Sequence, residues 1–193
     1  MMGGDDDLEA MRGHRVGART ERKRFIARSM LATVLGTHAS IAVLYFWVVP
    51  PLEGVAELAD RIALALRCSA VAALPYFAVC LVILARRFFE GSHDPLAGAE
   101  SMTLRIEGRV MQNTLEQLVP FVLAILALGT LLAPREMHLL PIATGAFVAA
   151  RLLYWWGYRR HGTLGRSPGV QMTFALTVPL VLAAGLRALA QAF

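Results

Sequence analysis

The sequence predicts an all-α integral membrane protein with five membrane-spanning helices. Its 193 residues are 56% hydrophobic and only 17% charged, and the mean hydropathy is +0.54. A soluble domain of this length carries more charge and fewer uninterrupted apolar runs. Five apolar runs are each long enough to cross a bilayer, which takes about 20 helical residues. The basic residues flank these runs and line no groove, so nothing indicates nucleic-acid binding.

The first apolar run lies within residues 26–50 and follows a polar tail. Residues 1–25 hold three consecutive aspartates followed by a cluster of arginines and a lysine. This composition predicts disorder up to the membrane surface, where the basic part can contact anionic lipid. A basic flank is also typical of signal peptides, but this apolar run is too long and no small-residue cleavage site follows it. We therefore expect a retained anchor helix.

Four further apolar runs follow, separated by segments rich in Pro, Gly and charge. The expected spans are about residues 61–89, 105–133, 139–158 and 170–190. The segment between the last two, RRHGTLGRSPG, is expected to be a basic loop. A transporter is disfavoured, because the chain shows neither an inverted repeat nor a helix broken at mid-membrane.

The distribution of Lys and Arg predicts the orientation of these spans. The amino-terminal tail and the segments 86–109 and 159–166 are basic, whereas the alternate loops 50–60 and 133–138 carry few cations. Basic loops stay in the cytoplasm. The amino terminus and both basic loops should therefore be cytoplasmic and the carboxyl terminus outside. A bacterial inner membrane and an endoplasmic reticulum fit equally well.

A polar stripe opens the third span. Arg105, Arg109, Asn113 and Glu116 are spaced by four, four and three residues, which places them on one face of a helix. Ionisable groups at membrane depth are costly, so they usually face a bundle interior and mark a site. For Arg105 and Glu107, a solvated helix start is an equal alternative.

Polar groups of the second and fourth spans should meet this stripe at the cytoplasmic face. Arg151 lies about two turns inside the fourth span, and Glu116 is the one acid of comparable depth, so we predict a buried ion pair between them. Tyr154 and Tyr158 share the helical face of Arg151. Several arginines, an amide and two phenols suit a small, multiply anionic ligand.

Simpler structural roles compete for some of these residues. Arg86 and Arg87, at the end of the second span, also fit plain cytoplasmic anchoring, which spacing alone favours. For Trp155 and Trp156 we favour an interfacial aromatic belt. No cluster of Cys and His has metal-ligand spacing, so no metal site is expected.

Three motifs resemble one family. LARRFF ends the second span, RVMQNTLEQLVPF lies in the third, and ARLLYWWGYRR with a following SP joins the fourth to the fifth. Together they resemble the membrane-associated proteins in eicosanoid and glutathione metabolism (MAPEG), which include microsomal glutathione transferases, leukotriene C4 synthase and prostaglandin E synthase. The resemblance covers about residues 80–190. It implies a four-helix domain over residues 60–193, a homotrimer, and glutathione held in a U shape between adjacent subunits, and it makes the first helix an addition.

The resemblance also implies roles for individual residues. The positions that match residues binding glutathione or supporting its site are Arg86, Arg109, Asn113, Glu116, Arg151, Tyr154 and Tyr158. One departure concerns the arginine that stabilises the glutathione thiolate, because this chain has Gly165 at the matching position. Arg166 is adjacent and is our candidate for that role, with Tyr154 or Tyr158 as hydroxyl donor to the sulfur.

Two functions follow from these implications. The first is a membrane-bound glutathione transferase or peroxidase that acts on lipophilic electrophiles or lipid hydroperoxides entering from the bilayer. The alternative is a non-catalytic subunit with the MAPEG fold that docks onto a larger membrane complex through residues 26–50. The extra helix and the displaced arginine both favour the alternative somewhat.

Overall fold

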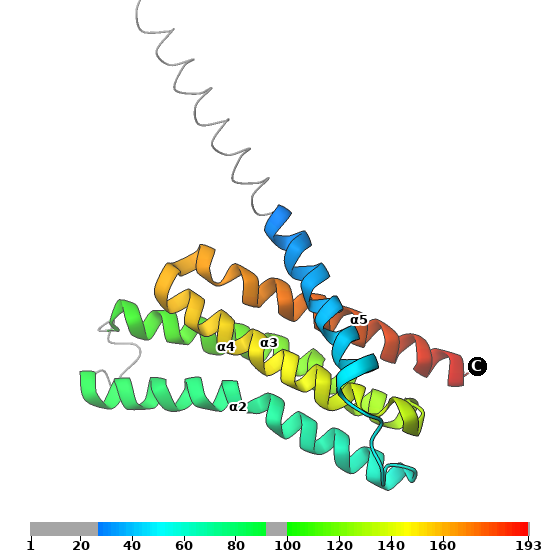
Figure 1. Cartoon of the computed structure of the whole chain (residues 1–193). Coiled ribbons are helices and arrows are strands. Elements are labelled where there is room, and N and C mark those ends of the chain that lie inside the picture. The colour runs from blue at the N-terminus through cyan, green and yellow to red at the C-terminus, as the bar shows by residue number, and fades with distance from the viewer. Residues whose placement is uncertain (1–26, 92–99, 193) are drawn as a thin grey trace, which may run out of the picture.

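The computed structural model describes residues 27–91 and 100–192, and five long helices account for most of them (Figure 1). They are the N-terminal helix Ala27–Val48, α2 Leu58–Glu90, α3 Met102–Leu131, α4 Leu139–Gly165 and α5 Ser167–Ala192. Each is long and apolar enough to cross a membrane. The predicted all-α membrane fold is therefore confirmed. The predicted polar tail, residues 1–25, lies outside the described residues.

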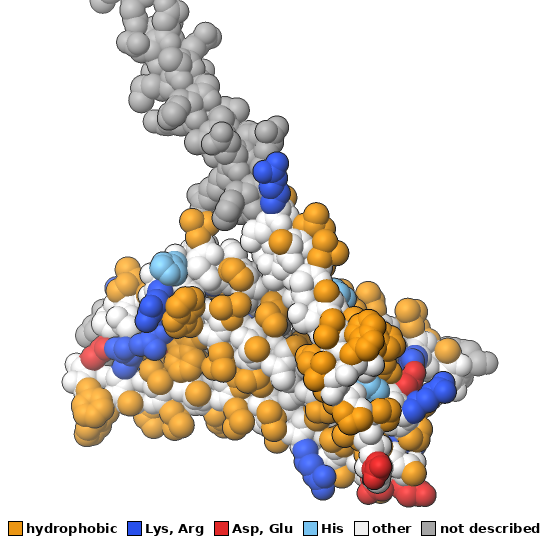
Figure 2. Space-filling model, viewed as in Figure 1, with side chains coloured by type: hydrophobic (Ala, Val, Ile, Leu, Met, Phe, Trp, Pro, Cys, Tyr) orange, Lys and Arg blue, Asp and Glu red, His pale blue; other side chains and the backbone are white. Residues whose placement is uncertain are grey.

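Helices α2 to α5 pack together as one bundle (Figure 1). The larger apolar core includes Phe121 and Phe147, whose rings stack with centroids 4.2 Å apart. A smaller cluster, which contains Val79 of α2, Val110 of α3 and Tyr154 of α4, lies toward the other end of the bundle. On the face shown in Figure 2, hydrophobic side chains cover the middle of the bundle and charged side chains gather toward its two ends. This arrangement suits a bundle surrounded by lipid.

Local signals set the helix ends near the smaller cluster. Ser101 caps α3, since its hydroxyl accepts a hydrogen bond from the Leu104 amide at 3.1 Å, as is typical of serine at this position. Gly91 follows α2 as its C-cap and has a left-handed backbone, with φ 66°. Glycine adopts this conformation at little cost in free energy. These ends bring the first turns of α3 beside the last turns of α2.

The predicted loop between the last two spans is mostly helical, so the expected boundary at Tyr158 was wrong. Helix α4 continues to Gly165 and α5 begins at Ser167. Within α4 only Gly162 departs from helical geometry, with φ 59° and ψ −140°. Pro168 lies in the first turn of α5, where backbone N–H groups have no partner within the helix. The N–H that proline lacks is therefore not needed there. The glycines and proline that indicated a loop therefore permit a tight reversal between two helices.

The N-terminal helix crosses the bundle beside α4 and α5 (Figure 1). Near its carboxyl end, His138 Nε2 lies 3.2 Å from the Tyr45 carbonyl oxygen, and the two rings stack with centroids 4.2 Å apart. Very little of the rest is buried. Residues Phe46 and Trp47 are 69% and 77% exposed, so this helix presents most of its apolar surface to the surroundings of the protomer.

Candidate functional site

Arg151 is the central residue of the polar cluster in the bundle. It is 1% exposed, and it donates hydrogen bonds to Asn113 Oδ1 at 3.1 Å and to the Gly169 carbonyl oxygen at 3.2 Å. A third bond goes to the Thr173 hydroxyl oxygen. The guanidinium thus connects α3, α4 and α5. Buried charge is tolerated only when it is hydrogen-bonded. Three neutral oxygens accept from the two terminal nitrogens of this arginine, whereas its Nε has no partner within the described residues.

The predicted Arg151–Glu116 ion pair is therefore wrong. Glu116 is exposed and accepts a hydrogen bond from Gln112 of the same helix at 3.2 Å. Asn113 points toward Arg151, and Glu116 lies about 60° away around the helix axis, which is enough to place it at the exposed edge of this face. Among the described contacts of Arg151 none is with a carboxylate, so this end of the bundle keeps an excess of positive charge.

The buried acid is Glu107, whose side chain is 0% exposed. Trp155 Nε1 donates to it at 2.7 Å, and Arg159 Nε lies 3.2 Å from its other carboxylate oxygen. This network ties the first turns of α3 to the last turns of α4. From the sequence, a solvated position was an equal alternative for Glu107, and an interfacial aromatic belt was favoured for Trp155. A usable signal was present, because Glu107, Val110 and Thr114 follow the spacing of one buried helical face.

The arginines at the end of α2 are engaged locally. Arg86 Nη1 lies 3.6 Å from Glu90 on the same helix. Arg87 donates to Glu100, just before α3, at 3.0 Å. Arg109 is exposed, and within the described chain it forms no ion pair. Arg109 and Glu116 thus lie at the surface of the protomer, whereas Arg86 is half-buried, and none of the three hydrogen-bonds to Arg151.

A polar cavity of about 260 Å³ opens beside this cluster. It is lined by Asn113, Thr163, Arg166, Ser167, Val170 and Gln171. Arg166 lies over the Tyr158 ring, with its guanidinium carbon 5.0 Å from the ring centroid. The Tyr154 ring is 5.9 Å from that of Tyr158, and its hydroxyl is buried close to Arg166. The structure therefore brings together Asn113, Arg151, Tyr154, Tyr158 and Arg166.

Close packing within the kinked end of α4 leaves no room for a side chain at position 165. A Cβ there would collide with the Gly157 carbonyl oxygen and would approach the His161 Cβ to 2.6 Å. An arginine at this position would force the end of α4 apart. The neighbouring Arg166 has room and lines the polar cavity.

Gly169 imposes a similar constraint where α5 crosses α4. A Cβ on Gly169 would meet the backbone of Tyr154 and the Ala150 carbonyl oxygen. Small residues at such crossings let helices in membranes approach closely. This approach carries the Gly169 carbonyl to within hydrogen-bond distance of Arg151.

Five membrane-spanning helices with a cationic cavity between the ends of α3, α4 and α5 define a multi-pass membrane protein with a polar site near one membrane face. A model described as "MAPEG family" matches residues 65–186. The chain belongs to the MAPEG family, as its motifs suggested, and is a membrane protein of the kind found in eicosanoid and glutathione metabolism. No curated protein and no solved structure matches it. The matched region begins within α2 and leaves out the N-terminal helix.

Proposed function

We propose that this protein is a membrane-bound glutathione-dependent transferase or peroxidase that acts on lipophilic electrophiles or lipid hydroperoxides. The observation that carries the proposal is the grouping of Asn113 and Arg166 in one cavity, beside Tyr154 and Tyr158. A cationic cavity next to phenol hydroxyls suits a ligand with carboxylates and a thiol. Membership of a family associated with glutathione supports glutathione as that ligand.

Surface residues of α3 supply the remaining contacts in this proposal. Arg109 is exposed and forms no ion pair in the described chain. Glu116 is also exposed, and it is hydrogen-bonded to Gln112 of its own helix and not to Arg151. Guanidinium groups bind carboxylates in a two-pronged manner, so Arg86 and Arg109 would hold the glutathione carboxylates. Glu116 would hold its ammonium. Because Arg109 and Glu116 are exposed, a neighbouring subunit of a homotrimer would enclose the ligand.

Catalysis would depend on the ionisation of the glutathione thiol. A free thiol has a pKa of about 8.5 and is mostly protonated at neutral pH. The Arg166 guanidinium would favour the thiolate electrostatically, and the Tyr154 or Tyr158 hydroxyl would donate a hydrogen bond to the sulfur. The protein would otherwise contribute proximity to an acceptor dissolved in the bilayer.

Both reactions begin with attack by this thiolate. In transfer, the sulfur forms a bond to an electrophilic carbon and a leaving group departs or the adduct is protonated. In hydroperoxide reduction, the sulfur attacks the terminal oxygen, the O–O bond breaks and a proton converts the alkoxide to an alcohol. A second glutathione then displaces hydroxide from the sulfenic acid, which yields glutathione disulfide and water.

Calorimetric titration of the detergent-purified protein with glutathione tests the proposal. Arg109→Ala should weaken binding about ten- to a hundredfold, because a charge-assisted contact is lost. Arg135→Ala is the matched control, since Arg135 is an exposed arginine in the turn Pro134–Glu136 before α4. The folded wild type should also conjugate a soluble electrophile. Absence of saturable binding by folded wild type would refute a glutathione site.

The alternative is a non-catalytic subunit that docks through residues 26–50. The observation that favours it is the exposure of Phe46 and Trp47 on a helix outside the matched region. In that case a stoichiometric partner should co-purify from native membranes and be lost when Phe46 and Trp47 are both replaced by Ser. Full turnover by the purified protein alone would count against this alternative.

A further inference from the structure

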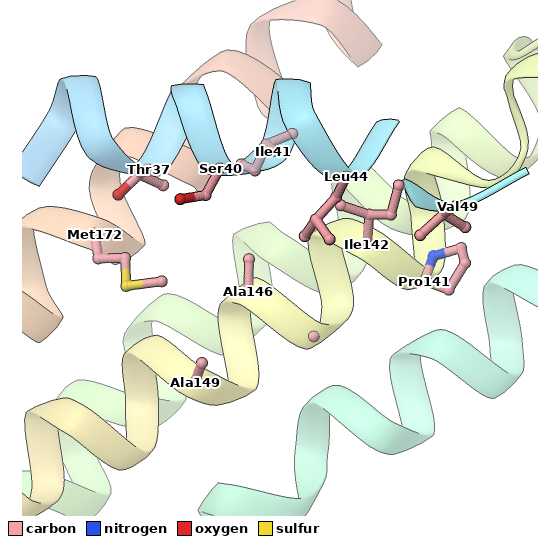
Figure 3. A pocket seen from close by; sticks show the side chains of 11 residues that line it. Thr37, Ser40, Ile41, Leu44, Val49, Pro141, Ile142, Ala146, Ala149 and Met172 are labelled. Atoms are coloured by element: carbon pink, nitrogen blue, oxygen red, sulfur yellow. The ribbon is translucent and has the colours of Figure 1, made fainter. Parts of the chain in front are cut away.

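The N-terminal helix encloses two apolar spaces against the bundle. One, of about 460 Å³, lies between this helix and α4. Figure 3 shows Ile41 and Leu44 of the N-terminal helix on one side of it and Ala146 of α4 on the other. The second, here called the apolar groove, measures about 480 Å³ and lies between the N-terminal helix and α5. Both spaces depend on a helix that lies outside the matched family region.

The apolar groove adjoins the polar cavity. Its walls include Met30 and Val34 of the N-terminal helix and Phe174 and Val178 of α5. Two further residues, Val170 and Gln171, line both the apolar groove and the polar cavity. The two spaces therefore share one wall, although one is polar and the other apolar.

A single face of α5 connects them. Arg166, Val170, Phe174 and Val178 follow one another at intervals of four residues, so they form one stripe that changes from cationic to apolar. Twelve residues of helix correspond to a rise of about 18 Å. This stripe is long enough to lie along an extended hydrocarbon chain whose polar end reaches Arg166.

Gln171 lies where the polar cavity meets the apolar groove, and its side chain indicates which ligand group would bind there. Its side-chain carbonyl oxygen is buried and, within the part of the chain described, has no hydrogen-bond partner. Buried polar atoms are normally satisfied, so such an atom calls for an explanation. A carbonyl oxygen only accepts hydrogen bonds, so the complementary group on a ligand is a hydrogen-bond donor. On a lipid chain, that donor is an O–H, such as a hydroxyl or hydroperoxyl.

We infer that the N-terminal helix and α5 bind the hydrocarbon chain of the acceptor substrate. The occupant is a single long-chain amphiphile, with its hydroxyl- or hydroperoxyl-bearing carbon at Gln171 and its chain between Val34 and Phe174. The inference rests on the proposed function, because the polar cavity beside the groove is the proposed glutathione site. It gives the additional helix a role in selecting the substrate, which the matched four-helix region alone does not supply.

Photolabelling tests occupancy without relying on turnover. The probe is a long-chain hydroxy fatty acid with a diazirine near its methyl end, added to the purified full-length protein without glutathione. Labels should concentrate on the groove residues and fall when the unlabelled hydroxy acid competes. Val34→Trp, which fills the groove, should reduce labelling severalfold, whereas Leu35→Trp should leave it unchanged, because Leu35 is 61% exposed. Labelling that spreads equally to Leu31 and Leu35 would overturn the inference.

Kinetics test the same groove from the substrate side. Val34→Trp should raise KM for a long-chain lipid hydroperoxide about tenfold, because several methylene groups lose their contacts. KM for glutathione and turnover of a short hydroperoxide should be retained. Val178→Trp fills the groove from α5 and should have the same effect, so misfolding of one variant does not decide the outcome. An unchanged KM in both folded variants would contradict the inference.

Two further results separate the inference from the proposed function. Groove labelling by a wild type that binds no glutathione would refute the proposed function and leave the groove as a lipid site. Gln171→Leu should abolish the preference for a hydroxylated chain over the same chain without the hydroxyl in competition with the probe. A preference that persists in Gln171→Leu would overturn the assignment of the O–H group.

Discussion

At the scale of single residues, the site depends on an arginine whose partners are all neutral. Arg151 donates hydrogen bonds to Asn113, Thr173 and the Gly169 carbonyl. No described carboxylate neutralises it, and the nearby buried acid, Glu107, is paired with Arg159. A guanidinium held in this way joins three helices.

Loss of this guanidinium should destabilise the protein. Arg151→Met removes three hydrogen bonds from a charged donor, each worth about 1.5–3 kcal/mol, although the Gly169 carbonyl keeps its bond from the Thr173 hydroxyl. The fall in stability should therefore be among the large values for a single substitution. Thr173→Val removes one bond and should cost less. Thermal unfolding in detergent would measure both, with Arg135→Met as the exposed control. Equal melting temperatures for Arg151→Met and this control would contradict a structural role.

At the scale of elements, the site forms where α4 reverses into α5. Gly162 turns the chain, Gly165 allows the end of α4 to fold back on Gly157, and Gly169 brings α5 against Tyr154. This reversal places Arg166 over Tyr158 at the mouth of the polar cavity.

The packing of α5 can be tested with matched glycine substitutions. Gly169→Ala puts a methyl group against the Tyr154 backbone, and such overpacking costs about 1–3 kcal/mol. Gly185→Ala, on the same helix, meets no atom within 4 Å and should stabilise α5 by about 0.5–1 kcal/mol through helix propensity. The midpoint of unfolding should therefore fall for Gly169→Ala and rise for Gly185→Ala. A stable Gly169→Ala variant with intact ligand binding would show that α4 and α5 are less tightly apposed.

At the scale of the whole molecule, the bundle has charged ends and an apolar middle on the face shown in Figure 2. The polar cavity lies near one of these ends. We predict from the basic residues at the site end, such as Arg160, that this end faces the cytoplasm. The turn that precedes α4 lies at the other end of the bundle.

This orientation leads to a labelling prediction. Cysteine introduced as Arg160→Cys should react with an impermeant maleimide only from the cytoplasmic side of sealed vesicles, and Arg135→Cys only from the opposite side. The native Cys68 is buried and Cys80 is partly buried within α2, so background labelling should be small. Reaction of both new cysteines from the same side would require an even number of spans between them. That result would contradict the assigned topology.

Much of the fold was predictable because it depends on local properties. Hydrophobic length located all five spans to within a few residues, except where the glycines of 159–169 suggested a loop. The spacing of Asn113, Tyr154 and Tyr158 predicted which polar groups share a helical face. The hydrogen bonds of Arg151 and the burial of Glu107 were missed, because they depend on how each helix is rotated about its own axis.

The sequence by itself therefore determined the membrane class, the number of spans, the family and the end of the bundle where polar groups gather, since hydropathy and periodicity are written along one helix at a time. Only the tertiary structure decided that Arg151 binds neutral oxygens, that Gly165 has no room for a side chain while Arg166 lines the cavity, and that the N-terminal helix borders a groove. These features arise from close contacts within the kinked end of α4 and between helices that are separated in the chain, where differences of an ångström or two select which side chains meet.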